Sequence, residues 1–185
     1  MSFRPPIAPG DHQAFMEVAM QQAQLSPPCP PKFCVGAVLV DADKNEIIAA
    51  GYYQELPPNR PGDPGTTHAE QCCFIKVAER HGVPEADIGA VFPRNTVLYT
   101  TMEPCSERPA GRNCVDRILA LNGAIKIIYV GVRKPDVVAG ENNGIERLRK
   151  SGIHVLMMDD EVEFRERVLE VTCAGHETRP TVYYP

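Results

Sequence analysis

The chain has 185 residues, enough for one domain with a sizeable core but hardly for two. Its hydrophobic content of 43% and charged content of 23% are typical of a folded globular protein rather than a disordered one. The formal net charge of -5 disfavours a general electrostatic grip on nucleic acid, and no apolar run approaches the length needed to span a bilayer.

The domain organisation follows from the distribution of prolines and apolar residues. Residues 1–10 are Pro-rich and are expected to form an irregular arm, residues 11–177 one domain, and residues 178–185 a C-terminal tail. The N-terminus lacks the apolar segment of a signal peptide, and the seven cysteines are an odd number. Reduced thiols and a cytoplasmic location are therefore expected.

The first part of the chain predicts a helix, a hairpin, a loop and a second helix. Asp11 is the expected N-cap of the first helix, and the prolines at 27–31 end it. A continuous apolar run at 35–40 predicts a strand buried on both faces, paired with a second strand at 46–52. The Pro-rich residues 55–65 form a loop that leads into His68 and is expected to wall a site. A helix at 67–81 follows, and Gly82 stops it.

The second part alternates strands with helices. Strands are expected at 96–100, 125–130 and 153–157, and helices at 114–121, 144–150 and 159–172. A hairpin followed by such units predicts an α/β fold with a mixed five-stranded sheet covered by helices on both faces.

Two short segments carry the residue types of a catalytic zinc site. His68 and Glu70 open the second helix, Cys105 follows a Thr-Met-Glu-Pro segment after a strand, and Cys114 lies nine residues later. One imidazole and two thiolates make three ligands and leave a fourth tetrahedral position open for water. A glutamate two residues from the imidazole can move protons on and off that water, so Glu70 is the candidate acid and base.

Simpler interpretations of the same residues stay open at this point. Glu70 also fits a capping box with Thr67 and would then only tie down the first helical turn. A closed structural zinc site would need a fourth protein ligand, for which Cys72 and Cys73 are the nearby candidates. The remaining cysteines and histidines are assigned packing or surface roles by default. His176, after the last helix, is either a tail residue or one that reaches back to the site.

Three further residues are candidates for substrate binding. Glu103 precedes the Pro-Cys pair and fits a hydrogen-bond acceptor for the substrate or a group that orients the loop. Arg108 and Arg112 lie in the interval between the two cysteines. They are either solvated loop charges or a phosphate clamp, because arginine matches phosphate geometry.

These motifs resemble the cytidine deaminase-like superfamily from about residue 33 to 176. The eight-residue interval between the cysteines, in place of the two residues usual in the superfamily, is similar to that of deaminases of riboflavin biosynthesis. The stretches that resemble the fungal, stand-alone branch are Val35-Gly36-Ala37-Val38-Leu39-Val40, Thr67-His68-Ala69-Glu70-Gln71-Cys72, Thr101-Met102-Glu103-Pro104-Cys105-Ser106, Cys114-Val115-Asp116-Arg117-Ile118-Leu119, Val130-Gly131-Val132 with Pro135-Asp136, and Ala174-Gly175-His176.

The resemblance implies a three-layer α/β/α sandwich and a hydrolytic deaminase. It implies Zn²⁺ held by His68, Cys105 and Cys114, with Glu70 as the proton shuttle. The implied substrate is 2,5-diamino-6-(ribitylamino)pyrimidin-4(3H)-one 5′-phosphate. A homo-oligomer, in the form of a dimer, is expected by analogy with the superfamily. Two departures concern the substrate wall: residues 58–65 form a longer segment than the family's, and Gly111-Arg112 is only an analogue of a bacterial Gly-Lys pair.

Three other functions compete with this hypothesis. The first is a deaminase of another small base or nucleoside, which a panel of substrates would distinguish from the deaminase of riboflavin biosynthesis. A nucleic-acid deaminase predicts a basic groove with stacking aromatic residues, against which stand the acidic pI near 5.5 and the lack of tryptophan. A partner-binding module that keeps zinc for stability predicts that Glu70→Gln changes nothing measurable.

Overall fold

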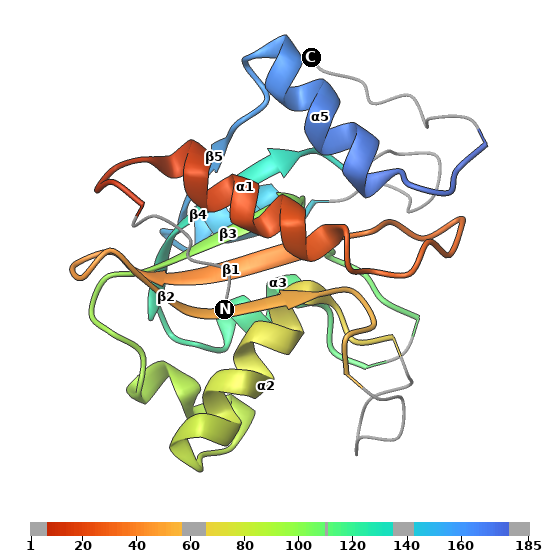
Figure 1. The fold of residues 1–185 in the computed structure, drawn as a ribbon. Coiled ribbons are helices and arrows are strands. Elements are labelled where there is room, and N and C mark those ends of the chain that lie inside the picture. Colours follow the sequence, from red (N-terminus) through yellow and green to blue (C-terminus); the bar gives the residue numbers. More distant parts are fainter. Residues whose placement is uncertain (1–6, 57–65, 110, 135–142, 178–185) are drawn as a thin grey trace.

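A five-stranded sheet forms the middle layer of the molecule (Figure 1). The computed structural model describes residues 7–56, 66–109, 111–134 and 143–177. The strands are β1 (Gly36–Asp41), β2 (Glu46–Tyr52), β3 (Thr96–Met102), β4 (Ile125–Val132) and β5 (His154–Met157). They lie in the order β2-β1-β3-β4-β5; β1 is antiparallel to both neighbours, whereas β3, β4 and β5 are parallel. The predicted mixed five-stranded sheet is therefore confirmed.

Helices cover both faces of this sheet (Figure 1). The helices α1 (His12–Ala23) and α5 (Val162–Thr172) pack against one face, where Phe15, Val38 and Phe164 belong to one buried cluster. The other face carries α2 (Ala69–His81), α3 (Cys114–Leu119) and α4 (Gly144–Lys150), with Phe74 and Ile128 in a second cluster. The result is the expected α/β/α sandwich.

The elements differ from the sequence prediction mainly at their ends. β3 runs on to Met102, because Met102 pairs with Val132 at the end of a lengthened β4. The ladder thus carries the chain directly to the segment that holds Cys105. A short 3₁₀ helix, η1 (Glu85–Ala90), was not expected; it buries Ile88 against the cluster under α2. α5 begins three residues later than predicted.

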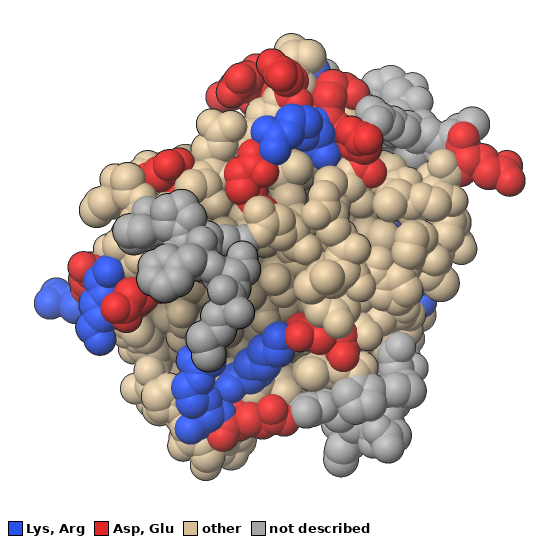
Figure 2. Space-filling model, in the orientation of Figure 1, with Lys and Arg blue, Asp and Glu red and all other residues tan. Residues whose placement is uncertain are grey.

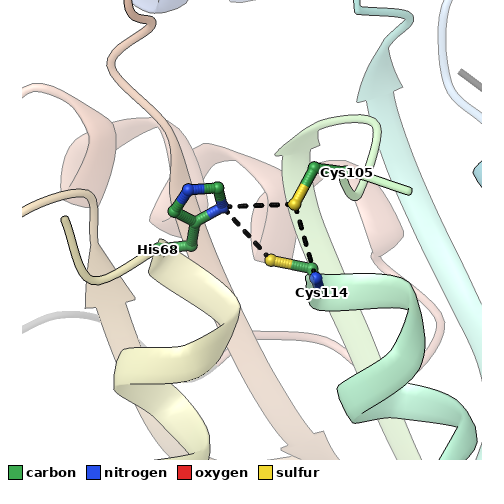
Figure 3. A group of neighbouring side chains, drawn as sticks. All are labelled: His68, Cys105 and Cys114. Carbon is green, nitrogen blue, oxygen red and sulfur yellow. Dashed lines mark hydrogen bonds between the residues drawn. The ribbon is translucent and has the colours of Figure 1, made fainter. Parts of the chain in front are cut away.

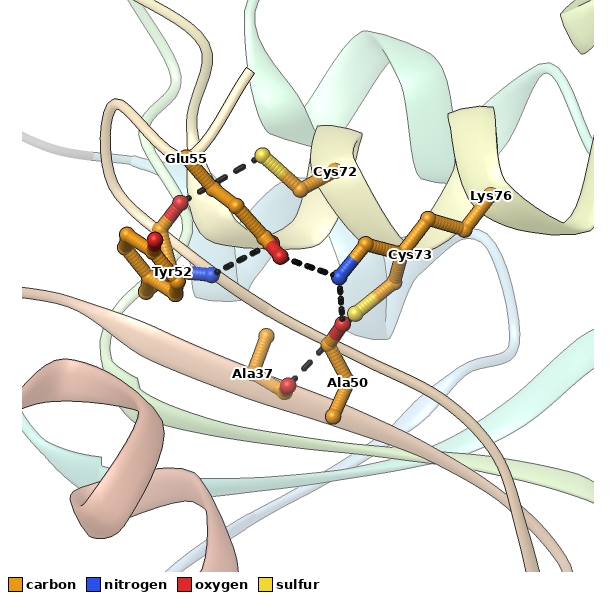
Figure 4. Close-up of polar contacts among 7 residues, drawn as sticks. All are labelled: Ala37, Ala50, Tyr52, Glu55, Cys72, Cys73 and Lys76. Carbon is orange, nitrogen blue, oxygen red and sulfur yellow. Dashed lines mark hydrogen bonds and ion pairs between the residues drawn. The ribbon is translucent and has the colours of Figure 1, made fainter. Parts of the chain in front are cut away.

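Contacts along α2 fix its position on the sheet (Figure 4). Gly51 of β2 allows a close approach, because a side-chain carbon there would lie 2.7 Å from the Cβ of Cys72 and 2.8 Å from the Ala69 carbonyl. Lys76 donates to the Ala50 carbonyl at 2.7 Å and pairs with Glu55. These contacts hold the first half of α2 against β2, and they thereby fix the position of His68 at the start of the helix.

Some predictions fall outside the described residues. They concern the N-terminal arm up to residue 6, the greater part of the loop at 55–65, the Pro135-Asp136 pair and the tail at 178–185. In the described ranges, none of the helices combines the length and apolar character required of a transmembrane span.

Candidate active site

The three predicted zinc ligands come from the starts of two helices and from the end of β3. His68 is the N-cap of α2, with an extended backbone at φ -78° and ψ 157°. Cys105 follows β3 after a two-residue link, and Cys114 is the first residue of α3. Asn113 caps α3 by accepting the backbone N–H of Asp116 at 2.8 Å. A helix N-terminus presents partial positive charge, which favours a thiolate at Cys114 once the metal has displaced its proton.

The ligand atoms converge on one point (Figure 3). The Nδ1 atom of His68 lies 3.3 Å from the Sγ of Cys114 and 3.5 Å from the Sγ of Cys105. All three ligand atoms lie within 4.8 Å of one another. Ordinary Zn–N and Zn–S lengths in a tetrahedron separate nitrogen from sulfur by about 3.6 Å. The donor set and its spacing therefore fit zinc bound through Nδ1.

The pKa values of the two thiols are shifted in opposite directions. A hydrogen bond from the Cys114 side chain and the adjacent His68 imidazole lower the pKa of the Cys105 thiol to about 4, in spite of its burial. The same hydrogen bond, together with burial, raises the pKa of Cys114 well above its ordinary value. Zinc needs both sulfurs as thiolates, so its binding displaces the proton on Cys114.

Neither of the neighbouring cysteines completes a closed site. The thiol of Cys72 donates to the Tyr52 carbonyl at 3.3 Å, and that of Cys73 to the Ala37 carbonyl at 3.5 Å, both against the sheet (Figure 4). Within the part of the chain that the structure describes, the ligand cluster contains His68, Cys105 and Cys114 alone. This arrangement provides three protein ligands, as expected for a catalytic rather than a structural zinc.

Glu70 is buried beside the ligand cluster. Its carboxylate accepts a hydrogen bond from the Thr100 hydroxyl at 3.1 Å and from the Cys114 thiol at 3.4 Å. Burial raises the pKa of Glu70, although the charge of His68 opposes this shift. The capping-box interpretation is wrong, because the N-cap of α2 is His68 and not Thr67. The carboxylate instead faces the metal ligands.

A cavity of about 450 Å³ opens over the cluster. His68, Glu70 and Cys105 lie in its wall. The remainder of the wall includes aromatic and charged residues, among them Lys32, Phe33, Tyr53, Glu103 and Lys134. The Tyr53 ring meets the His68 imidazole edge to face, with ring centres 5.8 Å apart. A small planar molecule can therefore lie against aromatic surface while it reaches the metal ligands.

The aromatic wall was missed by the sequence prediction, although the hairpin carried a signal for it. Phe33 lies just before β1 and Tyr53 just after β2. Gly36 pairs with Tyr52, so the start of β1 and the end of β2 lie side by side at the same end of the strands. The register of the hairpin thus brings both rings to the end of the strands where His68 and Cys105 lie.

Glu103, a candidate for substrate binding, lies in the cavity wall. Its backbone N–H donates to the Val132 carbonyl at 2.9 Å, and its carboxylate accepts the Lys134 N–H at 3.3 Å. Burial raises the pKa of Glu103, and the Lys134 N–H opposes that shift. The carboxylate is thus held at the meeting of the β3 and β4 ends, close to Cys105.

The two arginines of the cysteine interval are separated by the fold. Arg108 lies in the cavity wall, but its guanidinium is bound to Thr66 and Gln71. Arg112 is exposed and lines a different groove between α2 and α3. The structure does not bring the pair together as a clamp, and it leaves Arg112 outside the cavity.

His176 reaches back to the rim of the cavity. Its ring stacks on Phe33 with ring centres 5.0 Å apart, and its Nε2 lies 2.9 Å from the Lys32 carbonyl. The turn after α5 therefore supports the segment that presents Lys32 and Phe33. Of the other cysteines, Cys34 and Cys173 are buried and Cys29 is exposed, in agreement with packing or surface roles.

The chain matches the cytidine and deoxycytidylate deaminase zinc-binding region over residues 9–132. It belongs to this family of zinc-binding deaminases. The family binds zinc, and the cluster of His68, Cys105 and Cys114 is compatible with that metal.

Individual relatives narrow the likeness to one branch of the family. The chain is 30% identical over 171 residues to the diaminohydroxyphosphoribosylamino-pyrimidine deaminase of Schizosaccharomyces pombe. The matched residues make up 92% of this chain and 37% of that protein. It is 29% identical over 136 residues to riboflavin biosynthesis protein RibD of Aquifex aeolicus, covering 74% of this chain and 31% of the relative. The chain thus spans about a third of the length of these curated relatives.

A solved structure covers nearly the whole of both chains. The Aspergillus oryzae Rib2 deaminase in complex with DARIPP is 35% identical, with a TM-score of 0.75 over 91% of this chain and 93% of that one. This likeness confirms the cytidine deaminase-like fold and the predicted resemblance to the fungal deaminases of riboflavin biosynthesis.

Proposed function

We propose that this protein is a hydrolytic deaminase of an aminopyrimidine, namely 2,5-diamino-6-(ribitylamino)pyrimidin-4(3H)-one 5′-phosphate of riboflavin biosynthesis. The observation that carries the proposal is the Glu70 carboxylate, buried against a His/Cys/Cys cluster at the floor of a cavity. The likeness to a Rib2 deaminase that binds DARIPP supports the choice of substrate.

Glu70 would carry the protons of the reaction. When bound, zinc supplies Lewis-acid chemistry that makes water a nucleophile at neutral pH. Glu70 would take a proton from the attacking water and give it to the ring nitrogen. It would then take the remaining proton of the added hydroxyl and give it to the amino group, so that the carbonyl forms as ammonia leaves. Its burial, which raises the pKa of the carboxyl, suits a group that must both take and give protons near neutral pH. The Thr100 hydroxyl holds the carboxylate in place.

The cavity wall would orient the pyrimidine ring. Phe33 and Tyr53 offer aromatic surface on which a flat ring can stack. Glu103, fixed by the Lys134 N–H, would accept a hydrogen bond from a ring amino group. The ring is then held with its amine-bearing carbon toward the ligand cluster.

The phosphate end of the substrate is assigned to two lysines. Lys32 and Lys134 line the cavity, whereas Arg112 lies outside it and Arg108 is engaged elsewhere. We expect Lys32→Gln and Lys134→Gln each to raise the KM for the phosphorylated substrate roughly 10- to 150-fold, because a charge-assisted hydrogen bond contributes about 1.5–3 kcal/mol. Steady-state kinetics on the phosphorylated substrate and its dephosphorylated form is the measurement. Equal effects on both forms would contradict a contact with the phosphate.

A substrate panel tests the proposed reaction. Zinc-loaded protein is incubated with the diaminopyrimidine phosphate, cytidine, deoxycytidylate and guanine, and ammonia release is followed. The proposal predicts turnover of the first compound far above the others. Preferred release from a nucleoside or from guanine would assign the chain to another small-base deaminase, and no release from any of them would support the zinc-stabilised binding module.

Cellular context and assembly also remain proposals. None of the seven cysteines, all of which lie in the described residues, forms a disulfide, and this supports a reducing, cytoplasmic setting. Acidic and basic side chains are interspersed on the face drawn in Figure 2, with acidic ones gathered around α5, unlike the basic stripe of a nucleic-acid-binding protein. We expect no nucleic-acid partner, and a homo-oligomer by analogy with the superfamily.

A further inference from the structure

Arg108 connects two segments that carry the zinc ligands. It lies in the interval between Cys105 and Cys114, and its Nη1 donates to the Gln71 side-chain oxygen at 3.0 Å. Its Nη2 donates to the Thr66 carbonyl and to the Thr66 hydroxyl, each at 2.8 Å. Thr66 precedes His68 by two residues, and Gln71 follows it by three. One guanidinium thus holds the chain on both sides of the ligating histidine.

The cysteine half of the site has its own internal ties. The Cys114 N–H donates to the Sγ of Cys105 at 3.4 Å, and the Val115 N–H donates to the Cys105 carbonyl at 3.1 Å. These bonds fix the two sulfurs relative to each other. Arg108, anchored in the same interval, fixes this half relative to the half that carries His68.

The contacts of Arg108 are costly to exchange for a phosphate. Gln71 is 3% exposed, so loss of its partner would leave a buried amide oxygen unsatisfied, at a cost of about 1–3 kcal/mol. The planar fork of an arginine matches three acceptors at once, which the point charge of a lysine does not. We propose that Arg108 is a positioning residue that sets the separation of the His68 imidazole from the two sulfurs, and so zinc affinity, rather than a phosphate contact.

Zinc affinity is the readout, measured by competition with a chromogenic chelator. We expect Arg108→Gln and Arg108→Lys each to weaken zinc binding about 10–100-fold, as is usual when a group supporting a metal ligand is removed. Arg112→Gln is the matched control, because Arg112 lies in the same interval but outside the cavity, and it should bind zinc like the wild type. At saturating zinc, the KM of Arg108→Gln for the phosphorylated substrate should stay near that of the wild type.

The opposite pattern would overturn the proposal. Wild-type zinc affinity in Arg108→Gln, with a raised KM for the phosphorylated substrate alone, would make Arg108 a phosphate clamp. Because the affinity is measured without substrate, the result does not depend on the proposed reaction.

A second variant guards against misfolding of the first. Gln71→Leu removes one of the acceptors described for Arg108 and leaves Arg108 in place, so it should weaken zinc binding less than Arg108→Gln does. Adding Arg108→Gln to Gln71→Leu should then cost less affinity than it costs in the wild type, because the two residues share one contact. Fully additive losses would show that the two side chains act independently, and would contradict the proposal.

Discussion

Glu70→Gln is expected to abolish nearly all deamination while zinc remains bound. The glutamine keeps the size of the side chain and can still meet the Thr100 hydroxyl, but it cannot carry a proton. General acid–base catalysis is worth roughly 100- to 10,000-fold, so kcat should fall by at least about 100-fold. Ammonia release under saturating substrate and zinc content by atomic absorption are the two measurements.

The control for this variant is Glu170→Gln, an exposed carboxylate of α5 on the opposite face of the sheet. It should retain wild-type turnover and zinc content. If Glu70→Gln kept full activity, Glu70 would have no part in proton transfer. If it lost zinc together with activity, the carboxylate would act on the metal site and not on the substrate.

Cys114→Ser is expected to remove both zinc and activity. Cys114 is 1% exposed and begins α3, and a serine hydroxyl is a far weaker zinc ligand than a thiolate. A ligand present at 1,000 times its Kd stabilises a fold by about 4.1 kcal/mol. Chelation should therefore lower the melting temperature of the wild type, whereas the variant should melt at the same temperature with and without chelator.

Cys29→Ser is the matched control, since Cys29 is exposed and lies outside the cluster. Its zinc content, turnover and response to chelator should equal those of the wild type. A Cys114→Ser protein that still held one zinc per chain would show that the metal is bound elsewhere.

Much of the fold could be predicted because its sequence signals are local. The hairpin, the three β-α units and the stop of α2 at Gly82 each rest on a turn, a cap or an apolar run within a few residues. The extension of β3 to Met102 could not be predicted this way. It depends on pairing with Val132 across the sheet, and a Thr-Met-Glu-Pro sequence looks locally like a loop.

The candidate metal site and the glutamate beside it could be predicted for a different reason. Zinc chemistry restricts the residue types and spacing so strongly that His68, Glu70, Cys105 and Cys114 stand out before any fold is known. The choice of Nδ1 over Nε2 needs the orientation of the imidazole, which comes from the backbone of the α2 N-cap.

The substrate side was harder to predict because its contacts are long-range. Arg108 and Arg112 look equivalent in sequence, yet one is bound to Thr66 and Gln71 and the other lies in another groove. The sequence does not distinguish Lys32 and Lys134 from other lysines, because they are far apart along the chain and only the fold brings both to the cavity wall.

Deamination in ¹⁸O-labelled water tests the central claim most directly. The zinc-loaded protein is given the diaminopyrimidine phosphate, and the product is weighed by mass spectrometry while ammonia is counted. Hydrolysis at a site built from His68, Glu70, Cys105 and Cys114 predicts one labelled oxygen in the product for each ammonia released. After zinc removal, we expect neither labelled product nor ammonia. Unlabelled product, or equal turnover by the metal-free protein, would contradict this account.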